Sequence, residues 1–238
     1  MISRKLFLAL SGGVILAPPV SWSADEVPSS LDHILLGCSD LDRGIAFVEE
    51  RTGVRAAFGG VHPGRGTRNA LLSLGDRRYL EIIAPDPKQN VVQPFAARRL
   101  RLIQELITPH LIGWAAHSGE IEAVARKLRE SGIASDGPSP GSRKRPDGRV
   151  LSWKSLNLAD DYHGLLPFFI EWGSDSVHPS VDAPAGCYLE RFAVADPDAG
   201  ELSKTFQRLG IDPLVEHGDR PRLRAWITGP RGKFEASS

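Results

Sequence analysis

The chain has 238 residues, 41% of them hydrophobic, so it is long enough to bury one substantial core or two small ones. Lysine plus arginine and aspartate plus glutamate number 29 each, and this balance excludes a global charge that would attract nucleic acid or anionic lipid. We therefore expect no nucleic-acid partner, and any recognition of charge must be local.

The N-terminus differs in composition from the rest of the chain. Two basic residues precede the apolar run 6–20, and small residues follow it up to Ala24. This layout predicts a secretory signal over residues 1–24, cleaved near Ser23 or Ala24. The run contains glycines and prolines and is shorter than the roughly 20 apolar residues of a membrane span. We therefore expect an exported protein, periplasmic or secreted, whose mature chain has no stable membrane insertion.

The two cysteines, Cys38 and Cys187, leave two alternatives open. An oxidising compartment permits a disulfide bridge between them, whereas free cysteines are commonly buried as small apolar residues.

Three segments repeat the order strand, helix, glycine and β-branched residue, and this repeat is the main signal of organisation. They end at Gly53, Gly132 and Gly210, where glycine supplies the positive φ that stops a helix, and the first helix is expected to have its N-cap near Asp40. Further β-rich runs follow each helix, and an extra helix is expected near 96–106. The fold class predicted from this pattern is α+β, with the unit βαβββ occurring three times. The three sets of later strands are expected at 67–74 and 78–84, at 149–158 and 166–172, and at 222–228 and 233–236.

The arrangement resembles the vicinal oxygen chelate superfamily, and within it the glyoxalase-like subgroup, over nearly the whole mature chain. The segments that carry the resemblance are LDHILLGCSDLD, GGVHPGRGTRNALLSLGDRRYLEIIAPDP, SRKRPDGRVLSW, and PFFIEWG followed by HP. The resemblance implies that two modules, over residues 31–174, pair into a cupped mixed sheet around a divalent metal. A third βαβββ module at 187–238 would then pack on the edge of the cup or pair with its counterpart in a homodimer.

In this superfamily the first and last strands of each module each supply one metal ligand. The resemblance carries this geometry onto His33, Glu81 and Glu171. Two carboxylates and an imidazole suit Zn, Fe(II), Mn, Ni or Co.

The fourth ligand position is less regular. An ungapped register places Ile112 there, which cannot bind a metal, whereas a two-residue insertion before the second helix brings in His110. His117 is another candidate. Members of the superfamily that lose ligands often serve as metal-free binding proteins.

Glu81 and Glu171 each lie in an apolar strand, as the matching residue of successive modules. An unpaired buried carboxylate is expensive, so this coincidence favours a catalytic pair facing the cup. The pair would hold a metal or, without one, share a proton as a general acid.

Two basic segments are candidates for substrate binding. In GGVHPGRGTRN the glycines would let the backbone approach a ligand, with His62, Arg65, Arg68 and Asn69 near its carboxylate or phosphate. The alternative is a tight crossover between strands that needs positive φ. Arg143, in SRKRPDGRV, is either part of a second binding patch or part of a solvated hairpin.

Two classes of function remain, because the chain has no P-loop, dinucleotide fingerprint, HExxH, GxSxG or CxxC motif. The first is a metal-dependent lyase, isomerase or related enzyme that acts on a small oxygenated substrate. This substrate is either neutral or anionic. With Fe(II) it would be a ring-cleaving dioxygenase. The second is a metal-free protein that binds a small molecule or toxin in the same cup. The retained Glu81 and Glu171 favour the enzyme, and the missing fourth ligand favours binding.

Overall fold

The computed structural model describes residues 26–145 and 147–238. The expected secretory signal at 1–24 lies outside the described residues. Within them, no helix has the length and apolar character needed to cross a membrane.

The first unit begins with a buried strand and a capped helix. Asp40 accepts a hydrogen bond from the Arg43 amide at 2.9 Å, and Gly53 ends the helix with φ of 81°. Both ends of the helix therefore lie where the sequence predicts them. The unit runs through β1 (Leu31–Gly37), α1 (Leu41–Thr52), β2 (Ala57–His62), β3 (Thr67–Ser73) and β4 (Tyr79–Pro85).

The second unit repeats this order after two short helical segments, η2 (Pro94–Ala96) and α2 (Ala97–Gln104). It comprises β5 (His110–His117), α3 (Ile121–Glu130), β6 (Ser135–Lys144), β7 (Val150–Leu158) and β8 (Phe168–Trp172). The turn η3 (Tyr162–Gly164) interrupts the connection between β7 and β8.

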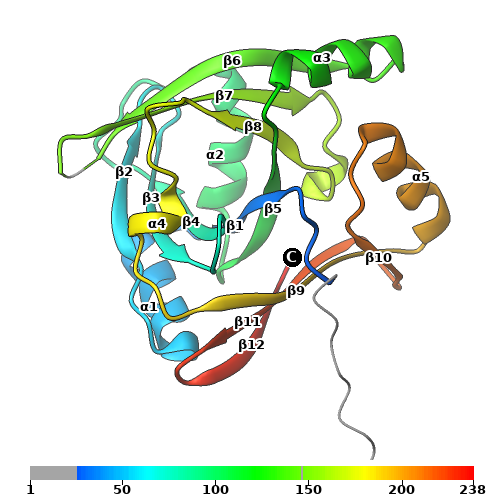
Figure 1. Cartoon of the computed structure of the whole chain (residues 1–238). Coiled ribbons are helices and arrows are strands. Elements are labelled where there is room, and N and C mark those ends of the chain that lie inside the picture. The colour runs from blue at the N-terminus through cyan, green and yellow to red at the C-terminus, as the bar shows by residue number, and fades with distance from the viewer. Residues whose placement is uncertain (1–25, 146) are drawn as a thin grey trace, which may run out of the picture.

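The first eight strands form one curled sheet with the order β2-β3-β4-β1-β5-β8-β7-β6. Strands β1 and β5 pair antiparallel and join the two units, while β1 with β4 and β5 with β8 are parallel. The edge strands β2 and β6 contact each other, so the sheet curls almost into a closed barrel (Figure 1). Helix α2 lies at the opening of this curl. The predicted α+β fold class with paired βαβββ modules is confirmed.

The third unit forms a separate four-stranded sheet with the order β10-β9-β11-β12. This sheet packs against α1 and β5, on the outer side of the large sheet (Figure 1). The unit comprises β9 (Tyr188–Asp196), α5 (Ala199–Leu209), β10 (Leu214–His217), β11 (Arg222–Gly229) and β12 (Gly232–Ser237), preceded by the short α4 (Pro179–Asp182).

The main hydrophobic core lies between the outer face of the large sheet, the helices and the small sheet. Trp114 of β5 packs against Phe192 and Phe206 of the third unit, with ring centroids 5.1 and 6.2 Å apart. Cys38 and Cys187 are both buried and free. Because the outer face carries the apolar side chains, alternate residues of the same strands are left to line the concave side.

Candidate functional site

A cavity of about 850 Å³ occupies the concave side of the curled sheet. Strands of both units line it, and residues of α2 form one of its walls. The polar residues that face it from the strands of both units include His33, His62, Asn69, Glu81 and Arg143.

Asp32 organises one end of this site. Its carboxylate, in a side chain that is 1% exposed, lies 2.7 Å from Nδ1 of His33 and 3.3 Å from Nε2 of His178. It also accepts a hydrogen bond from Nε1 of Trp172 at 3.0 Å. Burial raises the pKa of Asp32, but the hydrogen bonds from the two histidines outweigh it and hold the pKa well below its usual value. The carboxylate is therefore ionised.

An ionised carboxylate only accepts hydrogen bonds, so it determines the tautomer of His33. Nδ1 of His33 carries the proton that Asp32 accepts, and Nε2 is turned toward Glu81, whose Oε2 lies 3.6 Å away. The face of the ring is held as well, because the Tyr79 ring stacks on it with the two centroids 4.4 Å apart. Nε2 of His33 is therefore a fixed proton acceptor that faces the cavity.

Glu81 is the central acid of the cluster, 7% exposed on β4. Its Oε1 accepts a hydrogen bond from Nδ2 of Asn69 at 2.6 Å and lies 3.5 Å from Nε2 of His62. Arg143 donates to Oδ1 of Asn69 at 3.0 Å. Because Arg143 can only donate and the carboxylate only accepts, the Asn69 amide has one consistent orientation between them.

This network decides the charge of Glu81. Burial raises its pKa, but the rings of His62 and His33, the hydrogen bond from Asn69 and the charge of Arg143 together lower it below the usual value. Glu81 is therefore a buried carboxylate that stays ionised near neutral pH and opens onto a cavity.

His62 is also neutral. Burial lowers its pKa to about 4, which outweighs the opposing effect of Glu81. Its Nε2 lies 3.3 Å from the donor Nδ2 of Asn69, and its Nδ1 lies 2.9 Å from Oγ1 of Thr67. The ring therefore accepts at Nε2 and carries its proton at Nδ1.

The two adjacent glycines of β2 leave room for Arg143 to cross from β6. A Cβ at Gly59 would contact Nη1 of Arg143 and lie 2.5 Å from Oδ1 of Asn69, and one at Gly60 would lie 2.9 Å from the Lys144 carbonyl. These two glycines therefore do not serve to bring the backbone close to a ligand, as expected. They allow the edge strands β2 and β6 to pack closely at the seam where they meet.

The rest of the GGVHPGRG segment is the crossover that the sequence left as an alternative. Gly64 and Gly66 adopt φ of 72° and 68° in the turn between β2 and β3. Arg65 in this turn lines the cavity. Arg68 does not, because it points to the opposite face of β3 from Thr67 and Asn69.

Two of the expected metal ligands lie elsewhere. Phe168, Ile170 and Trp172 of β8 line the cavity, so Glu171 points to the other face, where it accepts a hydrogen bond from the Ile121 amide at 2.7 Å. The expectation that Glu171 faces the cup beside Glu81 is wrong, because it is one residue out of register with the inward side chains.

His110 also lies away from the site. It begins β5 opposite Gly37, and Ile112 lines the cavity in its place. His117, the other candidate, is exposed at the far end of the strand. The second unit therefore brings neither of its expected ligands to His33. Phe168 lies next to this histidine instead, with the two rings edge to face and their centroids 5.6 Å apart.

These positions test whether the residues suit a metal centre. Among residues 26–145 and 147–238 no group of three or more His, Cys, Asp or Glu side chains is arranged to hold a metal ion. Of the expected ligands only His33 and Glu81 lie together, with Nε2 of His33 3.6 Å from Oε2 of Glu81 and Asn69 donating to Oε1. The residues present do not fit the expected divalent metal.

Four residues of the site are not among the predicted site residues: Asp32, Tyr79, Arg99 and His178. Asp32 escapes notice because neighbours on a strand normally point to opposite faces. A β-bulge between β1 and β5 at Leu31/His33 changes this locally. The HP dipeptide was a signal for His178, which caps α4 by accepting a hydrogen bond from the Ser180 amide.

A curled sheet of two paired βαβββ units around one cavity is the architecture of the vicinal oxygen chelate superfamily. The glyoxalase-like domain family matches residues 31–221, and the chain belongs to it.

Solved structures with a similar fold include a hypothetical protein from Staphylococcus aureus. It has 19% identity and a TM-score of 0.60, covering 86% of this chain and 84% of that one. Methylmalonyl-CoA epimerase from Mycobacterium tuberculosis has 18% identity and a TM-score of 0.42, covering 63% and 91%. A variant of the Streptomyces coelicolor epimerase, in complex with 2-nitronate-propionyl-CoA, has 21% identity and a TM-score of 0.41, covering 63% and 99%. At these identities the likeness concerns the fold alone. No curated protein sequence matches the chain.

Proposed function

We propose that this protein is an isomerase or lyase that moves a proton on a small oxygenated anion. Glu81 is the base, and the proton transfer does not depend on a bound metal ion. The observation that carries the proposal is the ionised Glu81 carboxylate, buried on the cavity wall with its Oε2 facing Nε2 of His33. Buried acid–base pairs of this kind are typical of sites that exchange protons with a substrate.

The chemistry follows from the two tautomers. Glu81 takes a proton from a carbon next to a carbonyl group, which leaves a carboxylic acid and an enolate. The acid can pass this proton across 3.6 Å to Nε2 of His33, whose positive ring Asp32 then stabilises through Nδ1. Return of the proton to another atom gives an isomer, and loss of a leaving group from the enolate gives a lyase product. Arg143 and Arg65 supply positive charge near the developing oxyanion.

Proton exchange with solvent tests this role. The measurement follows deuterium uptake by NMR in D2O, over a panel of small 2-oxo and 2-hydroxy acids and their neutral amides. We expect the wild type to exchange at least one substrate and Glu81→Gln to lose at least about 100-fold in rate. Glu171→Gln is the matched control, because it removes the same group from the corresponding strand on the other face. Equal rates in wild type and Glu81→Gln would refute the proposal.

A second candidate function is metal-free capture of a small molecule. Aromatic rings favour it: Trp153 and Trp172 meet edge to face at 5.8 Å, and Tyr79 lies 6.5 Å from Trp172, all on the cavity wall. Such rings supply apolar contact area for a ligand. Ligand binding without any deuterium uptake would favour capture over catalysis.

We also propose that the protein is exported, on the basis of its N-terminal sequence. Sequencing of the N-terminus of protein recovered from the producing cells should begin at Ala24 or Asp25. An intact Met1 on the cell-associated protein would contradict export by cleavage.

A further inference from the structure

Arg99 is a cation of the cavity that the proton transfer described above does not use. It projects from α2 and lines both the main cavity and a small hollow beside it. Its guanidinium lies 5.9 Å from the centre of the Phe168 ring. Within the described part of the chain no carboxylate forms an ion pair with it. The negative charge of Asp161 acts on Arg99 without a direct ion pair, so the half-buried guanidinium can still bind an anion.

The charged residues around Arg99 are mostly basic. Arg65, Arg98, Arg99 and Arg101 line this side of the cavity, against the carboxylates of Glu105 and Asp161. Burial lowers the pKa of Arg99, while the negative charges of Asp161 and Glu81 oppose this effect. Arginines outnumber carboxylates here, so this side favours a negative group of a ligand.

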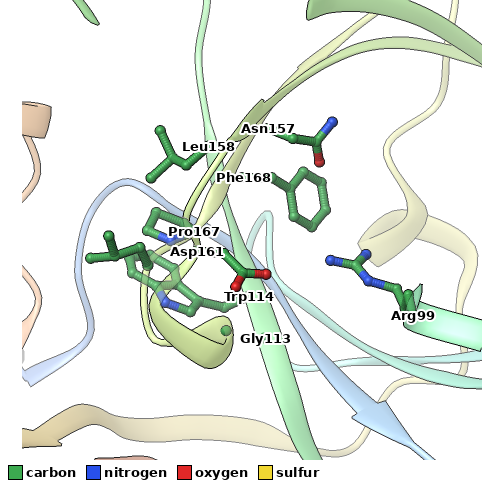
Figure 2. A pocket seen from close by; sticks show the side chains of 10 residues that line it. Arg99, Gly113, Trp114, Asn157, Leu158, Asp161, Pro167 and Phe168 are labelled. Carbon is green, nitrogen blue, oxygen red and sulfur yellow. The ribbon is translucent and has the colours of Figure 1, made fainter. Parts of the chain in front are cut away.

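The small hollow provides a second polar group next to Arg99. Its volume is about 30 Å³, enough for one hydroxyl-sized group, and Asn157, Asp161 and Phe168 line it. Figure 2 shows the side chains of Arg99 and Asp161 reaching toward one another beside the Phe168 ring. Oδ1 of Asp161 is buried and has no hydrogen-bond partner among the described residues. A carboxylate oxygen in this state requires a donor.

Nε1 of Trp114, which also lines the hollow, already donates to the Leu165 carbonyl at 2.7 Å. The hollow offers a ligand a cation at Arg99, a carboxylate acceptor at Asp161 and the amide of Asn157. Phe168 touches both His33 and Arg99, so a chain of a few carbon atoms along this ring reaches from the hollow toward the catalytic cluster.

We propose that the cavity takes a small hydroxy carboxylic acid whose carboxylate pairs with Arg99 and whose hydroxyl donates to Asp161. This inference rests on the proposed function, because it names the substrate class of the same cavity. It makes Arg99 and Asp161 residues of substrate recognition and leaves the proton transfer to Glu81.

Calorimetric titration with three matched probes tests the proposal on the full mature chain. The probes are 2-hydroxybutanoate, its neutral amide, and butanoate, which lacks the hydroxyl. We expect the hydroxy acid to bind at least about 10-fold more tightly than each of the others, as for a charge-assisted pair. Arg99→Gln should abolish the preference over the amide, and Asp161→Asn should abolish the preference over butanoate.

Two further variants separate recognition from folding and catalysis. Arg126→Gln, at an exposed arginine of α3 away from the cavity, should bind like the wild type. Glu81→Gln should keep the preference for the hydroxy acid while losing deuterium exchange. Circular dichroism and melting temperature establish that each variant is folded.

Three results would overturn the proposal: equal binding of acid and amide by the wild type, an unchanged preference in Arg99→Gln, or no binding of any probe. Tighter binding of 2-aminobutanoate than of the hydroxy acid would overturn the hydroxyl assignment. If the protein exchanges deuterium into ligands that have no carboxylate, and the rate is unchanged in Arg99→Gln, this inference is refuted and the proposed function still stands. The expected binding pattern without any deuterium exchange would refute the proposed function alone.

Discussion

Nδ1 of His33 lies 2.7 Å from Oδ1 of Asp32, although the two residues are neighbours on one strand. The bulge where β1 meets β5 turns both side chains toward the same site. The carboxylate that orients His33 is therefore supplied by the adjacent residue, with further hydrogen bonds from Trp172 and His178 holding it in place.

Asp32→Asn should damage both stability and activity. An amide cannot accept from three ring N–H groups as a carboxylate does, so a buried charge-assisted network is broken. We expect unfolding in urea to show a loss on the order of 3 kcal/mol, and deuterium exchange to fall by about 100-fold in protein that remains folded. A variant with wild-type exchange would show that the orientation of His33 is not needed.

The stability of the protein should depend on pH through His62. Its pKa is lowered to about 4 in the folded state, below the value of about 6.5 for an unfolded histidine. Between these values the unfolded chain binds the extra proton, so the contribution is complete above pH 6.5 and is lost as the pH falls toward 4. The full difference corresponds to about 3 kcal/mol.

His62→Asn should flatten the fall in unfolding free energy between pH 6.5 and 4. His217→Asn, at an exposed histidine, serves as the control and should follow the wild type. The pKa values of Asp32 and Glu81 are lowered, so their contributions are lost below the ordinary carboxylate pKa, at the acidic end of this window and beyond it. Parallel curves for wild type and His62→Asn would contradict the neutral, buried state of this ring.

Gly59→Ala should disturb the site from the seam between β2 and β6. The added Cβ would contact Arg143 and lie 2.5 Å from Oδ1 of Asn69, so the hydrogen bond that orients the Asn69 amide cannot persist unchanged. We expect about 1–3 kcal/mol of destabilisation, as for overpacking, together with slower exchange. Gly119→Ala is the matched control, since its Cβ would meet no atom within 4 Å. Similar effects of the two substitutions would refute this role of the seam.

Glu171→Gln should affect only the start of α3. The carboxylate accepts from the Ile121 amide at the N-terminus of that helix, where a negative charge is worth about 0.5 kcal/mol. Thermal unfolding should show a slight decrease, with deuterium exchange unchanged. A loss of exchange as large as that of Glu81→Gln would return Glu171 to the catalytic cluster.

Much of the fold could be predicted because local signals coincide with it. Asp40 and Gly53 bound the first helix as expected, and the repeat of strand, helix and glycine gave the modules. The resemblance correctly placed His33 and Glu81 in the site. Both lie on paired strands of the first unit, where Glu81 pairs with Leu35, two residues from His33.

The site's other partners depend on relations that the sequence does not carry. Glu171 differs from an inward residue by one position, and a one-residue difference in register reverses the face. Arg143 reaches Asn69 only because the sheet curls until its edge strands meet. A strand bulge and the closure of a sheet are decided by tertiary packing, so neither could be read from apolar periodicity.

The most direct test of the account is the deuterium-exchange rate of the wild type after dialysis against a chelator, with metal content measured on the same sample. We expect exchange to persist at its original rate in metal-depleted protein and to disappear in Glu81→Gln. Loss of exchange on metal removal, with recovery when a divalent ion is returned, would contradict it and place Glu81 in a metal centre.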